Sequence, residues 1–422
     1  MKNYCVVLIS LLFPILCNAQ GNSVSNNKTK FDDASVSSLK KSAEQGDAEA
    51  QFELGEMYYN GYDVAQDYKQ AFSWFKKSAE QGFANAQCKL GVMYDEGKGV
   101  AQDYKQAFSW YKKSAEQGYA YAQLQLGGMY FNGKGVAKDD KQSSYWYNKA
   151  ADHEDESAVQ FLIAKMYYNG YDAVQDYKKA FYLFKKFAEE GLPEAQYILG
   201  QMYYLGQGVA QDFKQAFSWY KKLAEQEDAE AQCMLGQMYY LGKGVAQDFK
   251  QAFSWYKKSA EQEDADAQCI LGQMYYLGKG VAQDYKQAFS WYKKSAEQED
   301  AVAQCMLGQM YYLGQGVAQD YKQSFSWYKK SAEQEDAVAQ CMLGQMYYLG
   351  EGVAQDYKQA FSWYKKSAEQ ENADAQCMLG QMYYFGQGVA QDEKEGIKWL
   401  QKAADQGEQN AINILKELNV AK

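Results

Sequence analysis

The apolar residues of this chain recur at the spacing of an amphipathic helix. Within residues 228–264, Ala231, Leu235, Gly236 and Tyr239 are spaced i, i+4, i+5 and i+8. Residues at this spacing lie on one face of an α-helix, because the helix makes one turn about every 3.6 residues. The segment therefore predicts a helix that buries one side against the rest of the protein.

A glycine-rich loop and a second helix are predicted to follow. Gly242 and Gly244 lie in the letters LGKGVAQ, where glycine can take backbone angles that other residues resist. Asp248 then suits the N-cap of a helix, and Gln251 three residues later completes a capping-box pattern. The expected buried side of this second helix consists of Ala252, Trp255, Tyr256 and Ser259.

This helix–loop–helix unit is repeated with a period of 36 residues. Leu-Gly pairs place glycine at positions 55, 91, 127, 200, 236, 272, 308, 344 and 380. The one longer step, of 73 residues, contains a degenerate copy with Ala164 in the glycine place and one extra residue near the letters DHEDES. All nine tryptophans occupy one repeat position, which Leu183 takes in the degenerate copy.

A fixed period of this size is the signature of a solenoid, in which stacking buries the faces that one hairpin cannot cover alone. The expected fold is all-α. It is an α/α solenoid, a superhelical array of about ten 36-residue helix–loop–helix repeats.

The repeat pattern resembles that of a known family. The letters A-x-A-Q-x-x-L-G-x-M-Y-x-x-G-x-G-V-x-x-D-x-x-x-A-x-x-W-Y-x-K-A/S-A look like the Sel1-like repeat, a relative of the tetratricopeptide repeat, from roughly Asp47 to Asp405. From Glu227 onward most copies read EQED where earlier copies read EQG. The resemblance implies a bacterial exported protein that scaffolds protein–protein interactions in the envelope or with host proteins.

Composition and charge fit a helical protein and exclude one class of partner. The chain has 422 residues, of which 47% are hydrophobic and 23% charged, with 39 tyrosines and only two prolines. Its net charge of −10 argues against nucleic acid, whose phosphates need a basic surface. A basic protein partner is compatible with this charge.

The N-terminal residues predict export. Lys2, the apolar run 6–16 and a small residue at Ala19 are typical of a secretory signal peptide at 1–19, cleaved after Ala19. Residues 20–35 read as a flexible leader, and 36–422 as the solenoid with an irregular copy near 146–200 and a C-terminal capping helix. The signal peptide predicts that the protein is exported, either periplasmic or secreted, and no transmembrane segment is expected.

No catalytic residue, cofactor or metal ligand is predicted. The chain has one histidine, His153, beside Asp152, Glu154 and Asp155. A metal site there is disfavoured, because adjacent residues on a loop rarely converge on one ion.

The motif S-x-x-K recurs in many copies, as in Ser254 and Lys257. It opens the sequences of penicillin-recognising serine enzymes, but their S-D-N and K-T-G elements are absent here. Some cysteine-rich exported relatives have been linked to β-lactam binding or weak hydrolysis, which makes such an activity the second alternative. Those relatives carry paired cysteines in each repeat, whereas this chain carries at most one.

The cysteines outside the signal peptide share one repeat position, three residues before the repeat glycine. They are Cys88, Cys233, Cys269, Cys305, Cys341 and Cys377. Equivalent residues on stacked helices should lie about 9–10 Å apart, whereas a disulfide needs Cα atoms within about 7 Å. We therefore predict free thiols that fill a seam, with a redox-sensitive or intermolecular role as the alternative.

A second stripe on the first helix is a candidate binding surface. In the tetratricopeptide fold that the repeats resemble, the corresponding stripe lines a concave groove and holds peptides. Carried over to this chain, it comprises Gln201, Tyr204, Gln237, Tyr240, Gln273, Tyr276, Gln309, Tyr312, Gln345, Tyr348, Gln381 and Tyr384. Tyrosine offers a large contact area and glutamine both a donor and an acceptor, which suits an extended polypeptide. A glycan, such as peptidoglycan, is the alternative ligand, and packing between neighbouring first helices is the alternative role of the tyrosines.

Overall fold

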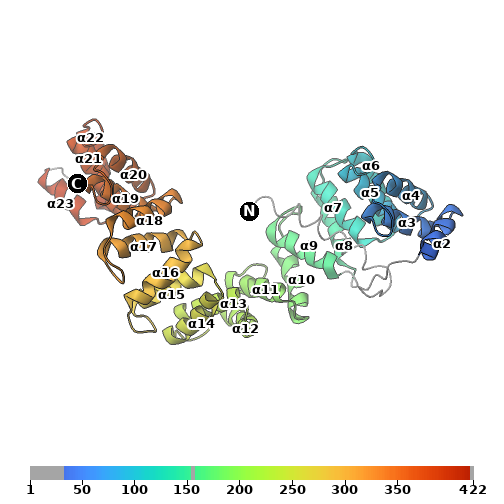
Figure 1. Ribbon diagram of the computed structural model, residues 1–422, viewed down its shortest axis with the longest axis horizontal. Coiled ribbons are helices and arrows are strands. Elements are labelled where there is room, and N and C mark those ends of the chain that lie inside the picture. The colour runs from blue at the N-terminus through green and yellow to red at the C-terminus, as the bar shows by residue number, and fades with distance from the viewer. Residues whose placement is uncertain (1–32, 154–156, 419–422) are drawn as a thin grey trace. The chain divides into compact units, whose positions relative to one another are not determined.

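The computed structural model describes residues 33–153 and 157–418, and every regular element within them is an α-helix (Figure 1). The all-α prediction is therefore confirmed. The predicted signal peptide lies outside the described residues, as does most of the predicted leader. The first three residues of helix α2 (Asp33–Glu44) overlap the end of that predicted leader.

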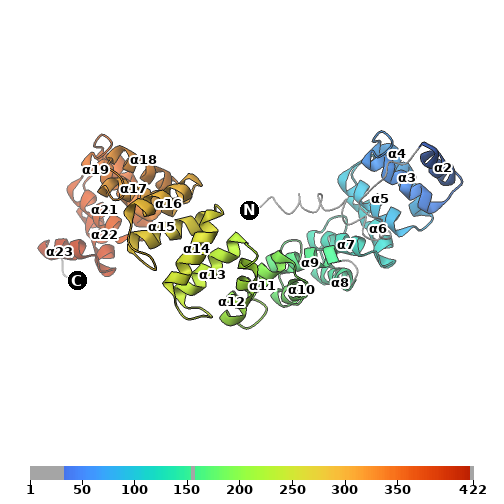
Figure 2. The same cartoon turned by 60° about the horizontal axis from the view of Figure 1, so that its bottom comes forward.

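The chain forms two compact units, residues 1–211 and 212–422. The described helices of unit 1 are α2, α3 (Ala48–Asn60), α4 (Tyr68–Glu80), α5 (Ala84–Glu96), α6 (Tyr104–Glu116), α7 (Ala120–Asn132), α8 (Asp140–Ala151), α9 (Ser157–Asn169), α10 (Tyr177–Glu189) and α11 (Pro193–Leu205). Those of unit 2 are α12 (Phe213–Ala224), α13 (Ala229–Leu241), α14 (Phe249–Glu261), α15 (Ala265–Leu277), α16 (Tyr285–Glu297), α17 (Ala301–Leu313), α18 (Tyr321–Glu333), α19 (Ala337–Leu349), α20 (Tyr357–Glu369), α21 (Ala373–Phe385), α22 (Glu393–Asp405) and α23 (Gln409–Glu417). Within each unit, consecutive helices pack against one another (Figure 2).

Side-chain caps fix both ends of the loop between the paired helices. In the repeat of α13 and α14, the carboxylate of Asp248 accepts hydrogen bonds from the backbone N–H groups of Lys250 and Gln251, at 2.9 and 3.0 Å. The predicted N-cap is thus confirmed. Its own N–H donates to the carbonyl oxygen of Tyr239 at 3.0 Å, so the loop supplies the contact that a capping box would take from the Gln251 side chain.

The repeat glycine lets the two helices of a pair approach closely. A Cβ on Gly308 of α17 would lie 2.7 Å from Cδ1 of Tyr328, whose ring is fully buried on α18. The same contact recurs at the other repeat glycines of unit 2 that face a tyrosine. Glycine at this place therefore serves helix packing, since any side chain would displace a buried ring.

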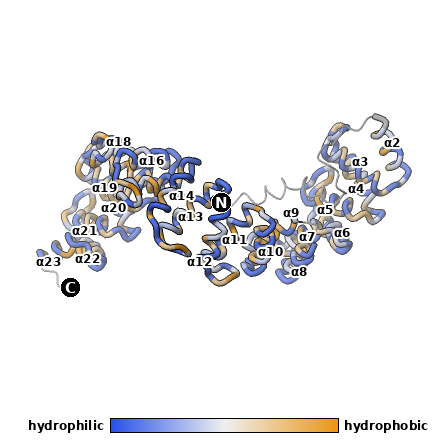
Figure 3. The backbone as a smooth tube through the Cα atoms, turned by 90° about the horizontal axis from the view of Figure 1, so that it is seen from below, coloured by the Kyte–Doolittle hydropathy of each residue, from blue (hydrophilic) through white to orange (hydrophobic). Residues whose placement is uncertain are grey.

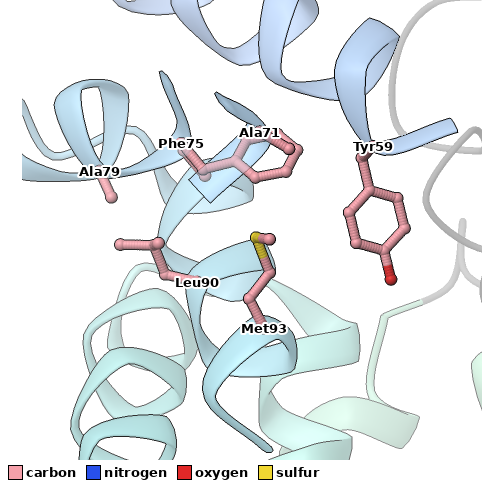
Figure 4. Packing of buried hydrophobic residues seen from close by; sticks show 7 residues of the cluster. Tyr59, Ala71, Phe75, Ala79, Leu90 and Met93 are labelled. Carbon is pink, nitrogen blue, oxygen red and sulfur yellow. The ribbon is translucent and has the colours of Figure 1, made fainter. Parts of the chain in front are cut away.

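The core of unit 1 is built in the same way from large and small apolar residues. Figure 4 shows Ala71, Phe75 and Ala79 of α4 against Leu90 and Met93 of α5, all buried. Along the tube in Figure 3, hydrophobic and hydrophilic positions alternate within the helices. None of the helices in the described ranges is long and apolar enough to cross a membrane.

Two residues of the repeat are buried differently from the prediction. Trp255 was expected in the core, but its indole is half-buried, with the Nζ atom of Lys258 lying 4.2 Å from the ring centre. Gln268, which apolar spacing does not mark, is only 3% exposed. Its amide donates to the carbonyl oxygen of Ala260 in the preceding repeat at 3.1 Å and accepts from Gln298 at 3.0 Å. The buried amide is tolerated because both its donor and its acceptor are satisfied. Its bond to Ala260 links one repeat to the next.

The turn between repeats keeps a left-handed backbone even where glycine is lost. Gly82 has a φ of 94°, and Glu263, at the equivalent place in an EQED copy, has a φ of 69°. A glutamate in this conformation costs roughly 1 kcal/mol relative to glycine, so the close packing of the repeats holds it there.

The degenerate copy, α9 with α10, keeps the helical pair with different core residues. Ala164 stands in the glycine place and is fully buried, as is Phe184 of α10, and Leu183 occupies the tryptophan place. Pro193 is the first residue of α11, where its missing N–H leaves no hydrogen bond unmade.

Candidate functional site

The predicted Gln/Tyr stripe, the twelve residues given above, lies on first helices of both units. In unit 2 all of its residues are half-buried except Gln273, which is exposed, and Gln201 and Tyr204 in unit 1 are half-buried. The stripe is therefore accessible, although none of its tyrosines stands clear of the surface.

Each stripe tyrosine of α15, α17 and α19 packs locally and spans to the next repeat. The ring of Tyr276 meets that of Tyr285 edge to face, with centroids 5.2 Å apart. Its hydroxyl donates to Oε1 of Gln315, in the loop of the following repeat, at 2.7 Å. Tyr312 donates in the same way to Glu351, at 2.7 Å, and Tyr348 to Gln387, at 3.0 Å. At Tyr240 the direction reverses, because Nζ of Lys279 donates to the hydroxyl at 3.0 Å.

The glutamines of the stripe join this network. The side chain of Gln345 donates to the hydroxyl of Tyr312 in the preceding repeat. Burial, together with the bond to Glu351, raises the pKa of Tyr312 to about 12. In unit 1, Tyr168 donates to Oε1 of Gln201 at 2.9 Å. The structure thus brings glutamines and tyrosines of adjacent repeats together. The tyrosine hydroxyls of α13, α15, α17 and α19 also connect each of these first helices to the loop of the following repeat.

Two further rows beside the stripe were missed by sequence reasoning. The last residue of each first helix in unit 2 is apolar and about half exposed; this leucine row consists of Leu241, Leu277, Leu313, Leu349 and Phe385. The loop residue that meets the stripe tyrosine is the second row, and it differs between copies: Lys279, Gln315, Glu351 and Gln387. Variation at one place among nearly identical copies was the signal that could have identified it.

In the S-x-x-K motif of α14, the lysine faces a glutamate. Ser254 and Lys257 are exposed on α14, and Nζ of Lys257 lies 3.8 Å from Oε1 of Glu261. Nε2 of His153 lies 3.1 Å from Oε1 of Gln123, a neutral amide. Glu154 and Asp155 lie outside the described residues, within which no group of three or more histidine, cysteine, aspartate or glutamate side chains could hold a metal ion.

The six cysteines in the described ranges are free thiols in the seam between repeats, and four of them are buried. Cys269 hydrogen-bonds the carboxylate of Asp300, the N-cap of the next first helix, and Cys305 does the same with Asp336. Burial, aided by these carboxylates, raises the pKa of Cys305 to about 12, and burial raises that of Cys341 to about 12 as well. Such thiols are protonated and unreactive at neutral pH.

We expect Cys305 and Cys341 in the native protein to be alkylated by iodoacetamide at pH 8 about a thousandfold more slowly than in urea. The reason is that each unit of pKa changes the thiolate fraction about tenfold. Site-resolved mass spectrometry of peptides gives the rate at each cysteine. Equal rates in the native and unfolded chain would contradict a buried, protonated seam.

Comparison with known proteins indicates one family of repeats. The model of the Sel1 repeat matches ten consecutive segments: 48–83, 84–119, 120–155, 157–192, 193–228, 229–264, 265–300, 301–336, 337–372 and 373–408. Residue 156, left between two matches, marks the insertion predicted near DHEDES. The search of curated proteins found no match.

Two solved structures extend the likeness along most of the chain. The first is c5321, described as a protective antigen present in uropathogenic Escherichia coli strains that displays an SLR fold. It is 36% identical, with 90% of each chain covered and a TM-score of 0.58. The second is a Sel1 repeat protein from Oxalobacter formigenes, 31% identical, with 82% of this chain and 89% of the other covered and a TM-score of 0.49.

Proposed function

This chain belongs to the Sel1 repeat family, and on that premise we propose that it is an exported, non-catalytic scaffold that holds an extended segment of a protein partner. The partner lies along the first-helix face of the repeats, on the Gln/Tyr stripe and the leucine row beside it. Sel1 and related helical repeats typically mediate protein–protein interaction, and the composition of this face carries the assignment further.

The observation that carries the proposal is the periodic exposure of apolar side chains on one edge. Each of the five residues of the leucine row is between 47% and 62% exposed. A row of half-exposed leucines rimmed by tyrosine hydroxyls and amides has the make-up of a protein-binding surface, an apolar strip with a polar border. The neighbouring first helices α17 and α19 contact one another, which brings their stripe residues onto one face.

Charge and location support the same function. The net charge of −10 favours a basic partner segment over an acidic one. The N-terminal sequence favours export, and the similar Escherichia coli protein is described as a protective antigen, which supports a location outside the cytoplasm. Ser254 of the S-x-x-K motif on α14 is exposed, and its Lys257 lies beside Glu261, which supports a non-catalytic role.

We expect the triple variant Leu241→Ser, Leu277→Ser and Leu313→Ser to lose at least about tenfold of partner capture, since apolar anchors dominate such interfaces. Capture is measured by crosslinking the purified chain in an envelope extract and in candidate host lysate. A second variant, Tyr240→Ser, Tyr276→Ser and Tyr312→Ser, should lose the same partner. It also breaks hydrogen bonds between each first helix and the loop of the next repeat, so its helical circular dichroism must first match the wild type.

The matched control replaces Lys257, Lys293 and Lys329, exposed on the second helices, by serine and should capture as the wild type does. A partner lost in both first-helix variants and kept in the control supports the proposal. Equal capture by all four proteins contradicts it and moves the site to another face. Capture of peptidoglycan alone replaces the protein partner by a glycan.

A further inference from the structure

Unit 1 contains a cavity of about 300 Å³ that is not part of the Gln/Tyr stripe of unit 2. It lies among α5, α6, α7, α8 and α9, and its lining includes Val92, Leu162 and Met166 as apolar walls. Its size suits one large side chain or a small molecule, and its walls favour a ligand with an apolar stem.

Two sequence departures create this cavity. Gly128 stands where the unit 2 copies carry the stripe glutamine, and Asp95 stands where they carry the stripe tyrosine. A Cβ on Gly128 would meet only the hydroxyl oxygen of Tyr147, at 3.3 Å, so the space beside it is open. Where unit 2 carries the stripe glutamine and tyrosine, unit 1 thus has a cavity lined by the carboxylate of Asp95.

Two polar groups of the cavity, the hydroxyl of Tyr111 and the carboxylate of Asp95, make no hydrogen bond or ion pair within the described chain. The hydroxyl of Tyr111 lines the cavity, its side chain is 1% exposed, and no described residue hydrogen-bonds it. Asp95 lies within no ion pair of the described chain, whereas the neighbouring Glu96 is paired with Lys98 at 2.8 Å. The ammonium of Lys134 attracts the Asp95 carboxylate without forming an ion pair with it, so the acceptors of this carboxylate and the buried Tyr111 hydroxyl leave room for a ligand that completes the hydrogen bonds.

The charge of the lining selects the ligand. Asp95, Glu96 and Asp172 contribute three carboxylates to the lining and Lys134 one ammonium. Glu96 is already paired with Lys98, and Asp172 accepts a hydrogen bond from Asn132 at 2.9 Å, which leaves Asp95 as the carboxylate open to a cationic ligand. A guanidinium is planar, stays charged, and offers five donors to acceptors on several sides, while its stem suits apolar walls. An ammonium, with its single charged point, would leave some of the acceptors unmatched.

We propose that this cavity binds an arginine side chain of the protein partner, between the carboxylate of Asp95 and the hydroxyl of Tyr111. This assignment rests on the proposed scaffold function and names one feature of the partner, an arginine. The acidic charge of the whole chain, −10, favours the same kind of segment.

The test uses the purified full chain and the tripeptide acetyl-Gly-Arg-Gly-amide in isothermal titration calorimetry. The matched probe replaces arginine by citrulline, which has the same shape without the charge. We expect saturable binding of the arginine peptide, at least about tenfold tighter than that of the citrulline peptide. No binding, or equal binding of both peptides, overturns the proposal.

Two variants place the binding in the cavity. Gly128→Gln installs the residue of the unit 2 copies and should abolish binding, and Asp95→Asn should weaken it about tenfold. Asp266→Asn makes the same chemical change at an exposed position of α15 and should bind as the wild type does. Unchanged binding by both cavity variants overturns the assignment.

This outcome is separate from that of the scaffold test. If the peptide fails to bind while the leucine-row variant still loses its partner, the cavity assignment falls and the scaffold function stands. If the peptide binds while the first-helix variants capture the partner as the wild type does, the scaffold function falls and the cavity still binds arginine.

Discussion

Gly308→Leu is expected to lower the free energy of unfolding of unit 2 by about 3 kcal/mol. Even a Cβ at this place would lie 2.7 Å from the ring of Tyr328, and leucine adds three carbons beyond it. The ring is 1% exposed and enclosed by the cluster of Ala332, Leu343 and Met346, so it has no space into which to move. The helices must separate, and the contact between repeats is lost with them.

The measurement is urea unfolding followed by circular dichroism. Gln309→Leu, which adds the same side chain one residue later on the half-buried stripe, is the matched control and should change the stability by about 0.5 kcal/mol or less. Equal midpoints for the two variants would show that the glycine is retained for another reason than packing.

Unit 2 is expected to unfold between pH 10 and pH 12. The pKa of Cys305, Cys341 and Cys377 is about 12 in the folded protein, against an ordinary value of 9.0, because burial disfavours the thiolate. Below pH 9 both states hold these protons, so pH has no effect through them. Above it the unfolded chain releases protons that the native chain keeps, and stability falls by about 1.4 kcal/mol per pH unit for each thiol.

Buried tyrosines add to this loss at the upper end of the range. Burial raises the pKa of Tyr292, Tyr328 and Tyr364 far above the ordinary value of 10.0, so the unfolded chain again ionises first. The three thiols alone lower the free energy of unfolding by about 4 kcal/mol per pH unit in this window. This loss is a large part of the stability of an ordinary domain.

Circular dichroism across pH 8 to 12 checks this expectation. The variant Cys305→Ala, Cys341→Ala and Cys377→Ala should show a shallower fall of stability with pH, whatever its stability at pH 8. A native spectrum that persists to pH 12, or an unchanged slope in the variant, contradicts the assigned cause.

The sequence alone was sufficient for the fold, because the period is carried by residues whose role is local. Asp248 caps a helix through its own side chain, and glycine at Gly242 ends one, so the helix limits could be read from single letters. Apolar spacing was a poorer guide to burial. Trp255 is apolar yet half-buried, and Gln268 is polar yet buried, because partners in adjacent repeats decide both.

The candidate site was only partly predictable for the same reason. The position of the tyrosines on one helix face follows from spacing, as for Tyr276 and Tyr312. That their hydroxyls meet loop residues 39 positions later depends on how successive repeats are stacked, which helix periodicity does not specify. The cavity of unit 1 arises from what Gly128 lacks, and an absent side chain gives no periodic signal.

The links between repeats have a further consequence, for how the gene can change. Between repeats, the amide of Gln268 reaches back eight residues and Tyr276 reaches forward 39, while within a repeat Ser295 reaches back 30 residues to Ala265. These offsets are constant among the copies of unit 2, so recombination that inserts or deletes one period there rejoins every donor with an equivalent partner. Arrays of different copy number can therefore arise in one step, whereas a deletion whose length is not a multiple of the period breaks these links at the junction.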